Sequence, residues 1–324
     1  MGIKTRFFIM SDTHGAAFEA KEAQKADVVI HCGDLTEESK IFEIRDTLQF
    51  LKSLDARTKL VIPGNHDFTL DIPKFQANIS AANIEDENLI RREFGEYGEA
   101  RRLFDEAKRD GIIFLDEGNH NINLENGARL RIYASPYTPG DRTWGFTYPP
   151  GSQHDFSIDQ GVDVIVTHGP PEGIFDKNSD KEKRLGCKSL FAAVAQTKPR
   201  LHCFGHVHGG WGARLVTWRD QLGDSPPSHF TAIDNNRSVF IEKLANMVPR
   251  EHDTKEMQEE KAAKLESYSR DGFISTSHCT GDEAPIQRGA QTLFVNAAIE
   301  GSTDALPIQP PWLVDIELDP TLDN

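Results

Sequence analysis

Five short motifs rich in aspartate, asparagine and histidine follow one another along this chain, each near the end of an apolar run. They are Ser11-Asp12-Thr13-His14, Gly33-Asp34, Gly64-Asn65-His66-Asp67, Thr167-His168-Gly169 and Gly205-His206-Val207-His208. Carboxylate, amide and imidazole donors without any thiolate suit Mn²⁺, Fe, Zn²⁺ or Mg²⁺. Two such ions side by side stabilise the attacking and leaving oxygens of a displacement at phosphorus. The motifs therefore predict a dinuclear, metal-dependent phosphoester hydrolase.

Alternating β-rich and helical segments surround these motifs, which indicates an α/β fold. Helical spacing of apolar residues predicts helices within 38–54, 99–110 and 188–196, the first capped near Thr36 or Ser39. Most motifs begin where a predicted strand stops, so we expect their side chains to gather at one edge of a layered sandwich. The predicted strands, several of them apolar on both faces as central strands are, are 7–10, 28–32, 60–63, 112–115, 130–134, 162–167, 201–205, 292–297 and 312–318.

The order of the five motifs resembles that of the calcineurin-like metallophosphoesterases, and the resemblance extends over most of the chain. A narrower resemblance is to the MPPED group, the metallophosphoesterase-domain-containing phosphodiesterases. It rests on THGPP at 167–171, GC at 186–187 and FGHVHGGWG at 204–212. The resemblance implies a four-layer αββα sandwich and phosphodiesterase activity on cyclic nucleotides or similar small diesters.

The resemblance also implies which side chains hold the two ions. The first ion would take Asp12, His14, Asp34 and His208, and the second would take Asn65, His168 and His206 beside a bridging Asp34. Two-metal sites hold their ions about 3.5–4 Å apart. At an extended strand end, Asp12 and His14 are two residues apart and point to the same side, so both can reach one ion. We expect Mn²⁺, with Fe, Zn²⁺ or Mg²⁺ as alternatives.

Catalysis is expected to need no protein nucleophile. A hydroxide bridging the two ions, its pKa lowered by both, would attack phosphorus, and Asp34 would be essential because it holds both ions. His66 is predicted to be the general acid that protonates the departing oxygen. Asn65, His66 and Trp144 are the predicted substrate-binding residues, although Trp144 could equally be a packing residue. Asp67 is expected to be structural.

The choice of substrate rests on what the motifs lack. Protein Ser/Thr phosphatases of this superfamily follow Gly-Asp with an Asp-Arg-Gly segment and carry Gly-Asn-His-Glu, whereas this chain has Gly33-Asp34-Leu35-Thr36 and ends the third motif with Asp67. A phosphodiester carries one negative charge fewer than a monoester and needs less cationic help, so we expect a small phosphodiester. A small-molecule phosphomonoesterase and a weakly catalytic nucleotide-binding scaffold are the alternatives.

The segment from about 217 to 290 departs from the rest of the chain. It is polar, rich in turn residues and contains the charged run EHDTKEMQEEK at 251–261. In the resembling family a strand like 292–298 follows Gly-His-x-His closely, so here it is displaced by roughly seventy residues, far beyond ordinary loop lengths. We interpret 217–290 as an insertion that is a partly helical surface segment or a flexible loop, with a lid or recognition arm at the site as the alternative.

Composition limits the other possibilities. The chain has 324 residues, of which 38% are hydrophobic, so we expect a single domain over 1–324 with a sizeable core. A net charge of −15 argues against binding nucleic acid, and no apolar run is long enough to span a membrane. The four cysteines form no Cys-x-x-Cys pair, which is typical of a cytoplasmic protein with reduced thiols. We expect a small phosphorylated substrate and no obligate protein partner.

Overall fold

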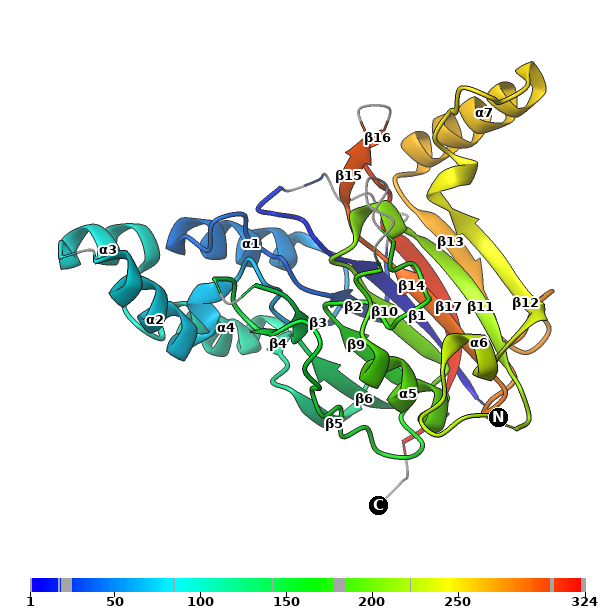
Figure 1. The fold of residues 1–324 in the computed structure, drawn as a ribbon, viewed down its shortest axis with the longest axis horizontal. Coiled ribbons are helices and arrows are strands. Elements are labelled where there is room, and N and C mark those ends of the chain that lie inside the picture. The colour runs from blue at the N-terminus through cyan, green and yellow to red at the C-terminus, as the bar shows by residue number, and fades with distance from the viewer. Residues whose placement is uncertain are drawn as a thin grey trace.

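Two twisted β-sheets lie face to face, with helices on both outer faces (Figure 1). This computed structural model describes residues 2–16, 18, 25–83, 85–141, 143–177, 184–221, 223–303 and 306–321. The first sheet runs in the order β13 (Ile274–Ser277), β17 (Trp312–Pro320), β1 (Ile3–Met10), β2 (Val28–His31), β3 (Thr58–Val61) and β4 (Ile112–Phe114). Within it β1 to β4 are parallel, and β17 is antiparallel to β1.

The second sheet contains the remaining long strands. Its order is β12 (Ile233–Lys243), β11 (Gly212–Trp218), β14 (Gln291–Asn296), β10 (Leu201–Phe204), β9 (Val164–Thr167), β6 (Ala128–Ser135) and β5 (Gly118–Asn123). The strands β14, β10, β9 and β6 are parallel. The last residues of β17 pair with the start of β6 and so join the two sheets at one corner. Short two-stranded pairs are β7 (Thr138–Pro139) with β8 (Thr147–Tyr148) and β15 (Glu300–Thr303) with β16 (Leu306–Ile308).

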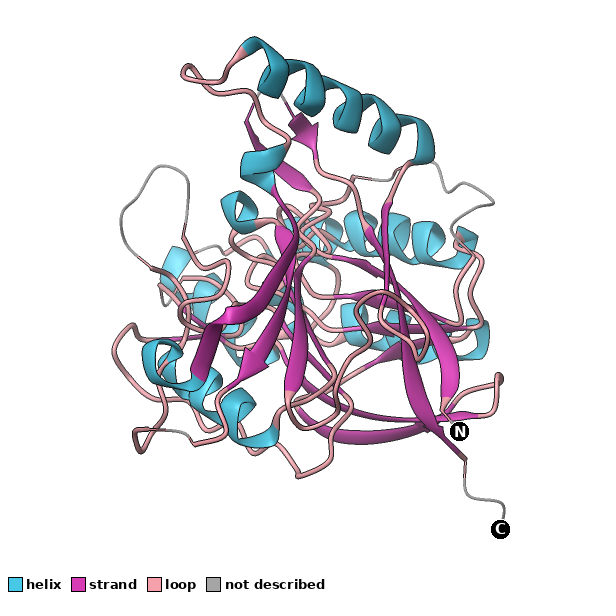
Figure 2. Ribbon diagram, turned by 90° about the vertical axis from the view of Figure 1, so that its right-hand side faces the viewer, coloured by secondary structure: helices cyan, strands magenta, loops and turns pink. Residues whose placement is uncertain are grey.

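Alternation along the strands produces three apolar layers. In β1, Phe7 and Ile9 pack between the sheets, whereas Phe8 and Met10 face the helices outside the first sheet. Those helices include α1 (Ile41–Ser53) and α4 (Glu99–Ala107), and α5 (Lys188–Thr197) covers the outer face of the second sheet. Side chains of a strand point alternately to its two faces, so one strand can serve two cores. The predicted four-layer αββα sandwich is confirmed, and Figure 2 shows the layers from the side.

All nine predicted strands and the three predicted helices are present. The first helix begins at Ile41 after Lys40, so the expected N-cap at Thr36 or Ser39 is wrong; instead the Glu43 carboxylate accepts hydrogen bonds from the backbone ahead of the helix. Elements that were not predicted include β5, β11, β12 and β13 and the helices α2 (Ile72–Ala82), α3 (Glu87–Phe94), α6 (His229–Ala232) and α7 (Lys255–Asp271).

The segment 217–290 is built into the sandwich. It supplies β12 at the edge of the second sheet and β13 at the edge of the first. Met247 is fully buried in the core between the sheets, and Glu242 of β12 anchors α7 through Lys264 at 2.6 Å and Tyr268 at 3.0 Å. The flexible-loop interpretation is therefore wrong, because these strands extend both sheets, whereas α7, with Lys261 as its only buried residue, agrees with a partly helical surface insertion. None of the described helices is long and apolar enough to cross a bilayer.

Candidate metal centre

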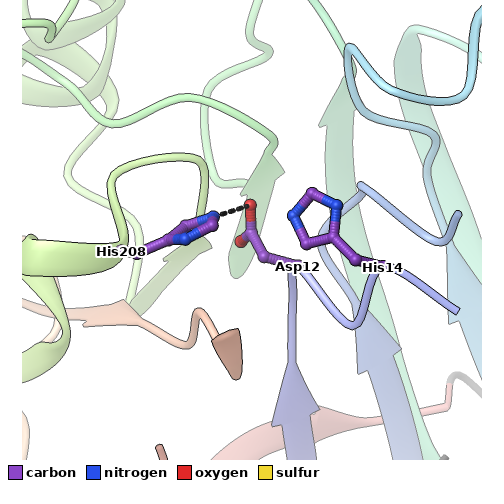
Figure 3. A group of neighbouring side chains, drawn as sticks. All are labelled: Asp12, His14 and His208. Atoms are coloured by element: carbon purple, nitrogen blue, oxygen red, sulfur yellow. Dashed lines mark ion pairs between the residues drawn. The ribbon is translucent and has the colours of Figure 1, made fainter. Parts of the chain in front are cut away.

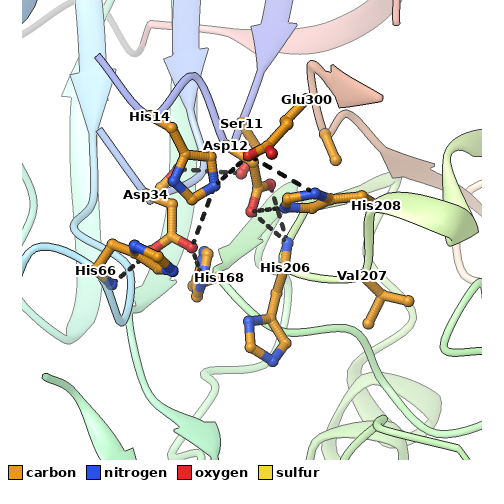
Figure 4. Close-up of polar contacts among 12 residues, drawn as sticks. Ser11, Asp12, His14, Asp34, His66, His168, His206, Val207, His208 and Glu300 are labelled. Carbon is orange, nitrogen blue, oxygen red and sulfur yellow. Dashed lines mark hydrogen bonds and ion pairs between the residues drawn. The ribbon is translucent and has the colours of Figure 1, made fainter. Parts of the chain in front are cut away.

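The five motifs meet at one edge of the sandwich because they follow five strands that end there. Motif residues come directly after β1, β2, β3, β9 and β10, and the carboxyl ends of neighbouring parallel strands lie on the same side of a sheet. Figure 4 shows side chains from both sheets pointing toward one another at this edge. The structure thus brings together all seven predicted metal ligands. That they bind metal stays a prediction.

One cluster consists of Asp12, His14 and His208 (Figure 3). One potential ligand atom from each residue lies within 4.8 Å of the others, and His208 Nε2 is 3.3 Å from Asp12 Oδ1. Asp12 is fully buried, and its carboxylate also accepts hydrogen bonds from the backbone N–H of His206 at 2.9 and 3.0 Å. The cluster therefore joins the first motif to the last.

The backbone at Asp12 and His14 is not extended, so the geometric argument from the sequence was wrong. The strand β1 ends at Met10, and Asp12 and His14 have φ of 53° and 47°, in the left-handed region. Asp34 and His206 share this conformation, with φ of 51° and 64°. Non-glycine residues adopt it at an energetic cost that the surrounding structure must offset. Backbone hydrogen bonds from His14 to Asp34 and from Gly15 to Leu35 hold the loop in place.

The second cluster consists of Asp34, His168 and His206, with Asn65 beside it. His168 Nε2 lies 3.3 Å from Asp34 Oδ2 and 2.9 Å from Asn65 Oδ1. The other ring nitrogen, Nδ1, lies 3.0 Å from the carbonyl oxygen of Cys32, which can only accept a hydrogen bond. Nδ1 therefore carries a proton, so Nε2 is the ring nitrogen that faces the cluster and that could bind a metal ion in place of its own proton.

Asp34 lies between the two clusters. Its Oδ2 is 3.3 Å from His168 Nε2 and 3.9 Å from His14 Nε2, and its Oδ1 accepts a hydrogen bond from the backbone N–H of His66 at 2.8 Å. This is the position that a carboxylate shared by two cations would need. The backbone hydrogen bond to Oδ1 fixes the carboxylate, which limits the freedom that metal binding would have to remove.

The electrostatics of the centre favour cations. Burial opposes charge on Asp12 and Asp34, yet the neighbouring histidines hold the pKa of both carboxyl groups below their usual range. Burial also opposes charge on His168, but the field of Asp34 and Asp12 raises its pKa to about 9. His206 differs, since burial and the nearby His168 lower its pKa to about 4. The same field that holds a proton on His168 would attract a divalent cation.

His14 provides an independent indication that the donor set fits metal ions. Both of its ring nitrogens are buried, and neither forms a hydrogen bond of good geometry, although carboxylate oxygens of Glu37 and Glu300 lie 3.0 and 3.1 Å away. A buried imidazole that faces carboxylates without forming a hydrogen bond is costly, and such exceptions in a folded protein call for an explanation. Together with two buried carboxylates and an amide oxygen, these nitrogens form a set of oxygen and imidazole donors that fits divalent cations such as Mn²⁺.

Asp67 holds two of the motif loops together. Its carboxylate accepts hydrogen bonds from the backbone of Gly64 at 2.8 Å and of Leu35 and Thr36 at 3.0 Å, and from the Thr36 hydroxyl at 2.7 Å. Burial, and next the charge of Asp34, raise its pKa to about 6. The expected structural role of Asp67 agrees with these contacts, all of which go to the loops and none to a ligand histidine.

Two further contacts explain how closely the loops approach. A Cβ atom added to Gly64 would overlap the backbone nitrogen and Oδ1 of Asp34, so a side chain there would push the two motifs apart. On the opposite side, Asn296 Nδ2 donates to the carbonyl oxygen of Val207 at 2.9 Å and so holds the Gly-His-x-His turn against β14. The tight packing of small and amide residues sets the separation of the ligands.

His66 lies at the open side of the centre. Its Nδ1 is 2.8 Å from the carbonyl oxygen of Glu37, which can only accept, so Nδ1 donates this hydrogen bond and Nε2 is the ring nitrogen left for a second proton. Its ring is 4.6 Å from that of His14 and 4.3 Å from that of Trp144. Trp144 therefore contacts the predicted general acid, and the hydrogen bond from Gly145 to the carbonyl oxygen of Asn65 at 3.0 Å holds its loop there.

Two carboxylates that the sequence did not predict also border the centre. Glu37 Oε2 is 3.0 Å from His14 Nδ1. Glu300 Oε2 is 3.1 Å from His14 Nε2, and Figure 4 shows Glu300 beside His14. Glu37 follows Gly33-Asp34 by three positions, and this closeness in sequence could have indicated that Glu37 borders the centre. Glu300 had no such indication in the sequence, because it approaches only through residues 297–300, whose backbone bonds to Ser11 and Asp12.

Gln309 fixes the position of Glu300 and was also missed. Its fully buried Nε2 lies within 3.2 Å of the carbonyl oxygens of His208 and Ala298 and 2.7 Å from that of Glu300. The start of β15 and the turn carrying His208 are therefore attached to one side chain. A lone glutamine in a loop gives no pattern from which this could be predicted.

The chain matches proteins from several organisms over the region that contains the motifs. It is 35% identical to metallophosphoesterase domain-containing protein 1 of Homo sapiens and of Mus musculus over 213 residues, which is 64% of this chain and 62% of each relative. It is 32% identical to a protein of Emericella nidulans named probable rhamnogalacturonate lyase C, over 66% of this chain and 18% of that protein. The chain thus spans less than two thirds of the length of each of these three relatives.

The model of the calcineurin-like phosphoesterase family matches residues 5–210. This range is more than half of the chain and contains every motif from Asp12 to His208, whereas Glu300 and Gln309 lie outside it. Since the matched residues are those that converge at the strand ends, this chain belongs to the calcineurin-like phosphoesterase family.

Proposed function

We propose that this protein is a metal-dependent hydrolase of small phosphodiesters, with cyclic nucleotides or similar molecules as substrates. The observation that supports the proposal is the meeting of two ligand clusters on either side of Asp34, beside an imidazole that is not part of either cluster. Membership of the calcineurin-like phosphoesterase family supports the reaction class. The finer assignment to diesters rests on the charge around the centre.

In this proposal each side chain has a stated task. Two bound divalent ions would activate a water molecule as the nucleophile and offset the negative charge of the phosphoryl oxygens. Asp34 would contact both ions, and the other ligands would be shared as Asp12, His14 and His208 on one side and Asn65, His168 and His206 on the other. His66, oriented by the carbonyl oxygen of Glu37, would hold on Nε2 the proton that the departing oxygen takes.

The preference for diesters is supported by Glu37 and Glu300. Their carboxylates flank His14 at 3.0 and 3.1 Å, and the ion pairs at the centre involve carboxylates and histidines, with no lysine or arginine among the described residues. A phosphomonoester dianion would meet more repulsion here than a diester monoanion. Trp144, 38% exposed beside His66, could provide a flat wall for a substrate ring.

The proposal includes Mn²⁺ as the metal and the cytoplasm as the location. The donor set supports Mn²⁺ among several ions. The four cysteines are buried free thiols, which fits a reducing compartment. The proposed partner is a small phosphorylated molecule, since the net charge of −15 disfavours nucleic acid.

The experiment compares initial rates of the Mn²⁺-loaded protein on bis(p-nitrophenyl) phosphate and on p-nitrophenyl phosphate. Asp34→Ala serves as the inactive control, and His120→Ala, which changes a half-buried histidine on β5, serves as the matched control. Faster, metal-dependent diester cleavage is expected. A clear monoester preference would reject the diester assignment, and no turnover on either substrate would indicate a nucleotide-binding scaffold.

A further inference from the structure

We propose that a second pocket, beside the turn that carries His208, binds a small organic phosphate with a flat apolar group. The pocket has a volume of about 600 Å³ and lies between residues 173–177, the start of β11, the end of β12 and the segment 244–250 (Figure 1 locates the strands). Pockets for small molecules usually measure about 300–1,000 Å³. This binding site is separate from the proposed hydrolase function and does not depend on it.

Positively charged side chains line the pocket, although the protein as a whole is acidic. Its lining includes one acidic residue, Asp176, which pairs with Arg184 at 2.5 Å, and five cationic residues, Lys177, Arg184, Arg214, Lys243 and Arg250. Apart from Arg184, none of these cations has an ion-pair partner within 4.0 Å in the part of the chain that the structure describes. Like charges repel when they are held together, so an anion in the pocket would relieve this repulsion.

The nearest carboxylates are engaged elsewhere. Glu242, next to Lys243, turns to the other side of β12 and binds Lys264 and Tyr268 of α7. Asp253, whose side chain accepts from the backbone N–H of Arg250, forms its ion pair with Lys261 at 2.7 Å. The protein therefore compensates these carboxylates with other cations and leaves the cations of the pocket available to a ligand.

Arg214 is the side chain most clearly lacking a partner. Its Nε is buried without a hydrogen bond, whereas one terminal nitrogen donates to Asn235 at 2.8 Å. Burial lowers the pKa of this guanidinium, which means that the protein bears a desolvation cost there. Guanidinium groups bind phosphate through several N–H donors at once, and such charge-assisted bonds are stronger than neutral ones.

Two phenylalanine rings supply the apolar part of the site. Phe240 is 48% exposed although it lies at the pocket, and its ring is 6.1 Å from that of Phe175. The guanidinium carbon of Arg214 and the ammonium of Lys243 lie 4.7 and 5.0 Å from the centre of the Phe240 ring. A planar group stacked on Phe240 would place an attached phosphate within reach of Arg214 and Lys243. Inorganic phosphate would lack the contact with the Phe240 ring.

The test measures binding of phenylphosphonate and of methylphosphonate to the full chain by calorimetry. Both probes have a carbon–phosphorus bond that phosphoester hydrolysis cannot cleave, and they differ only in the ring. Each titration is done with the Mn²⁺-loaded protein and repeated in excess chelator, because binding to the metal centre would be lost with the metal. We expect phenylphosphonate to bind in both conditions and more tightly than methylphosphonate.

Variants then locate the site. Lys243→Ala should weaken phenylphosphonate binding about tenfold, the size expected for one charge-assisted hydrogen bond. Phe240→Ala should weaken only the phenyl probe, and Lys255→Ala, which changes a lysine whose side chain is 90% exposed on α7, should change neither. Loss of all binding in chelator, or equal affinity in Lys243→Ala and Lys255→Ala, would overturn the proposal. Turnover of bis(p-nitrophenyl) phosphate by the same variants tests the hydrolase function separately.

Discussion

The metal centre and the cationic pocket border the same turn but are built in opposite ways. The centre is acidic, and Asp12, Asp34 and His206 hold left-handed backbone conformations in loops fixed by hydrogen bonds. The pocket is basic, and its charges sit at the ends of long side chains from four segments. Metal binding and catalysis need fixed geometry, whereas recognition of an anion tolerates flexible cations. A metal centre is therefore visible in a sequence as short motifs, whereas a pocket that recognises an anion through scattered cations is not.

Asp34→Ala should have the largest effect, and this effect should be confined to the metal centre. Loss of the residue between both clusters should remove the metals and reduce diester turnover by at least about 10³-fold. Binding of phenylphosphonate in chelator should stay unchanged, since Asp34 does not line the pocket. Metal content by mass spectrometry and calorimetry on the same preparation measure both effects. A variant with normal metal content would contradict the bridging position.

His66→Ala tests whether the centre separates metal binding from proton transfer. The variant should keep its metals but should hydrolyse alkyl diesters about 10³-fold more slowly. Activated aryl diesters should be affected much less, since a good leaving group needs no proton. Rates on the two substrate types are compared with those of His120→Ala. An equal loss on both substrates would reject the general-acid role.

Asp67→Ala tests whether the centre depends on rigid loops. The change leaves the buried backbone N–H groups of Leu35, Thr36 and Gly64 without their acceptor and should lower the free energy of unfolding by about 2 kcal/mol. Urea unfolding of the metal-free protein measures this effect without the contribution of bound ions. A stability equal to wild type would mean that the loops are held by other contacts.

Glu300→Gln should change the rates least of these variants. It tests whether negative charge at the centre favours diesters over monoesters. Removing one carboxylate near His14 should raise the rate on p-nitrophenyl phosphate relative to bis(p-nitrophenyl) phosphate by roughly threefold, because the monoester carries more negative charge. The effect should shrink with added salt, since the Glu300 side chain is 49% exposed. Glu251→Gln, at an exposed site, is the control. An unchanged ratio would remove the electrostatic argument for diesters.

The sequence predicted the parts of the fold that depend on local pattern. The apolar runs identified all nine strands that carry or flank the motifs, and the rule that parallel strands end at one edge brought the seven ligand positions together. The edge strands β12 and β13 were missed because their faces are largely polar and each is stabilised by its neighbour in the sheet.

The site was predictable in its ligands but not in its surroundings. The left-handed conformation of Asp12 and His14 arises from hydrogen bonds to the loop at 33–35, which no local pattern reveals. Glu300 and Gln309 reach the centre through tertiary contacts with segments nearly three hundred and about one hundred positions away. Trp144 was identified as an aromatic residue of an irregular loop, and only the structure brings its ring against His66.

The pairing of β1 with β17 has a consequence for how the chain folds. Arg6 and Asp315, which form a bidentate ion pair across these strands, are 309 positions apart. During synthesis β1 therefore emerges long before the neighbour that covers its edge, and the edge stays open until β17 has left the ribosome. Contacts of such sequence separation slow folding, and exposed strand edges favour aggregation meanwhile. We expect the first sheet to be completed only after β17 has been synthesised, and folding to benefit from chaperones that shield the open edge of β1.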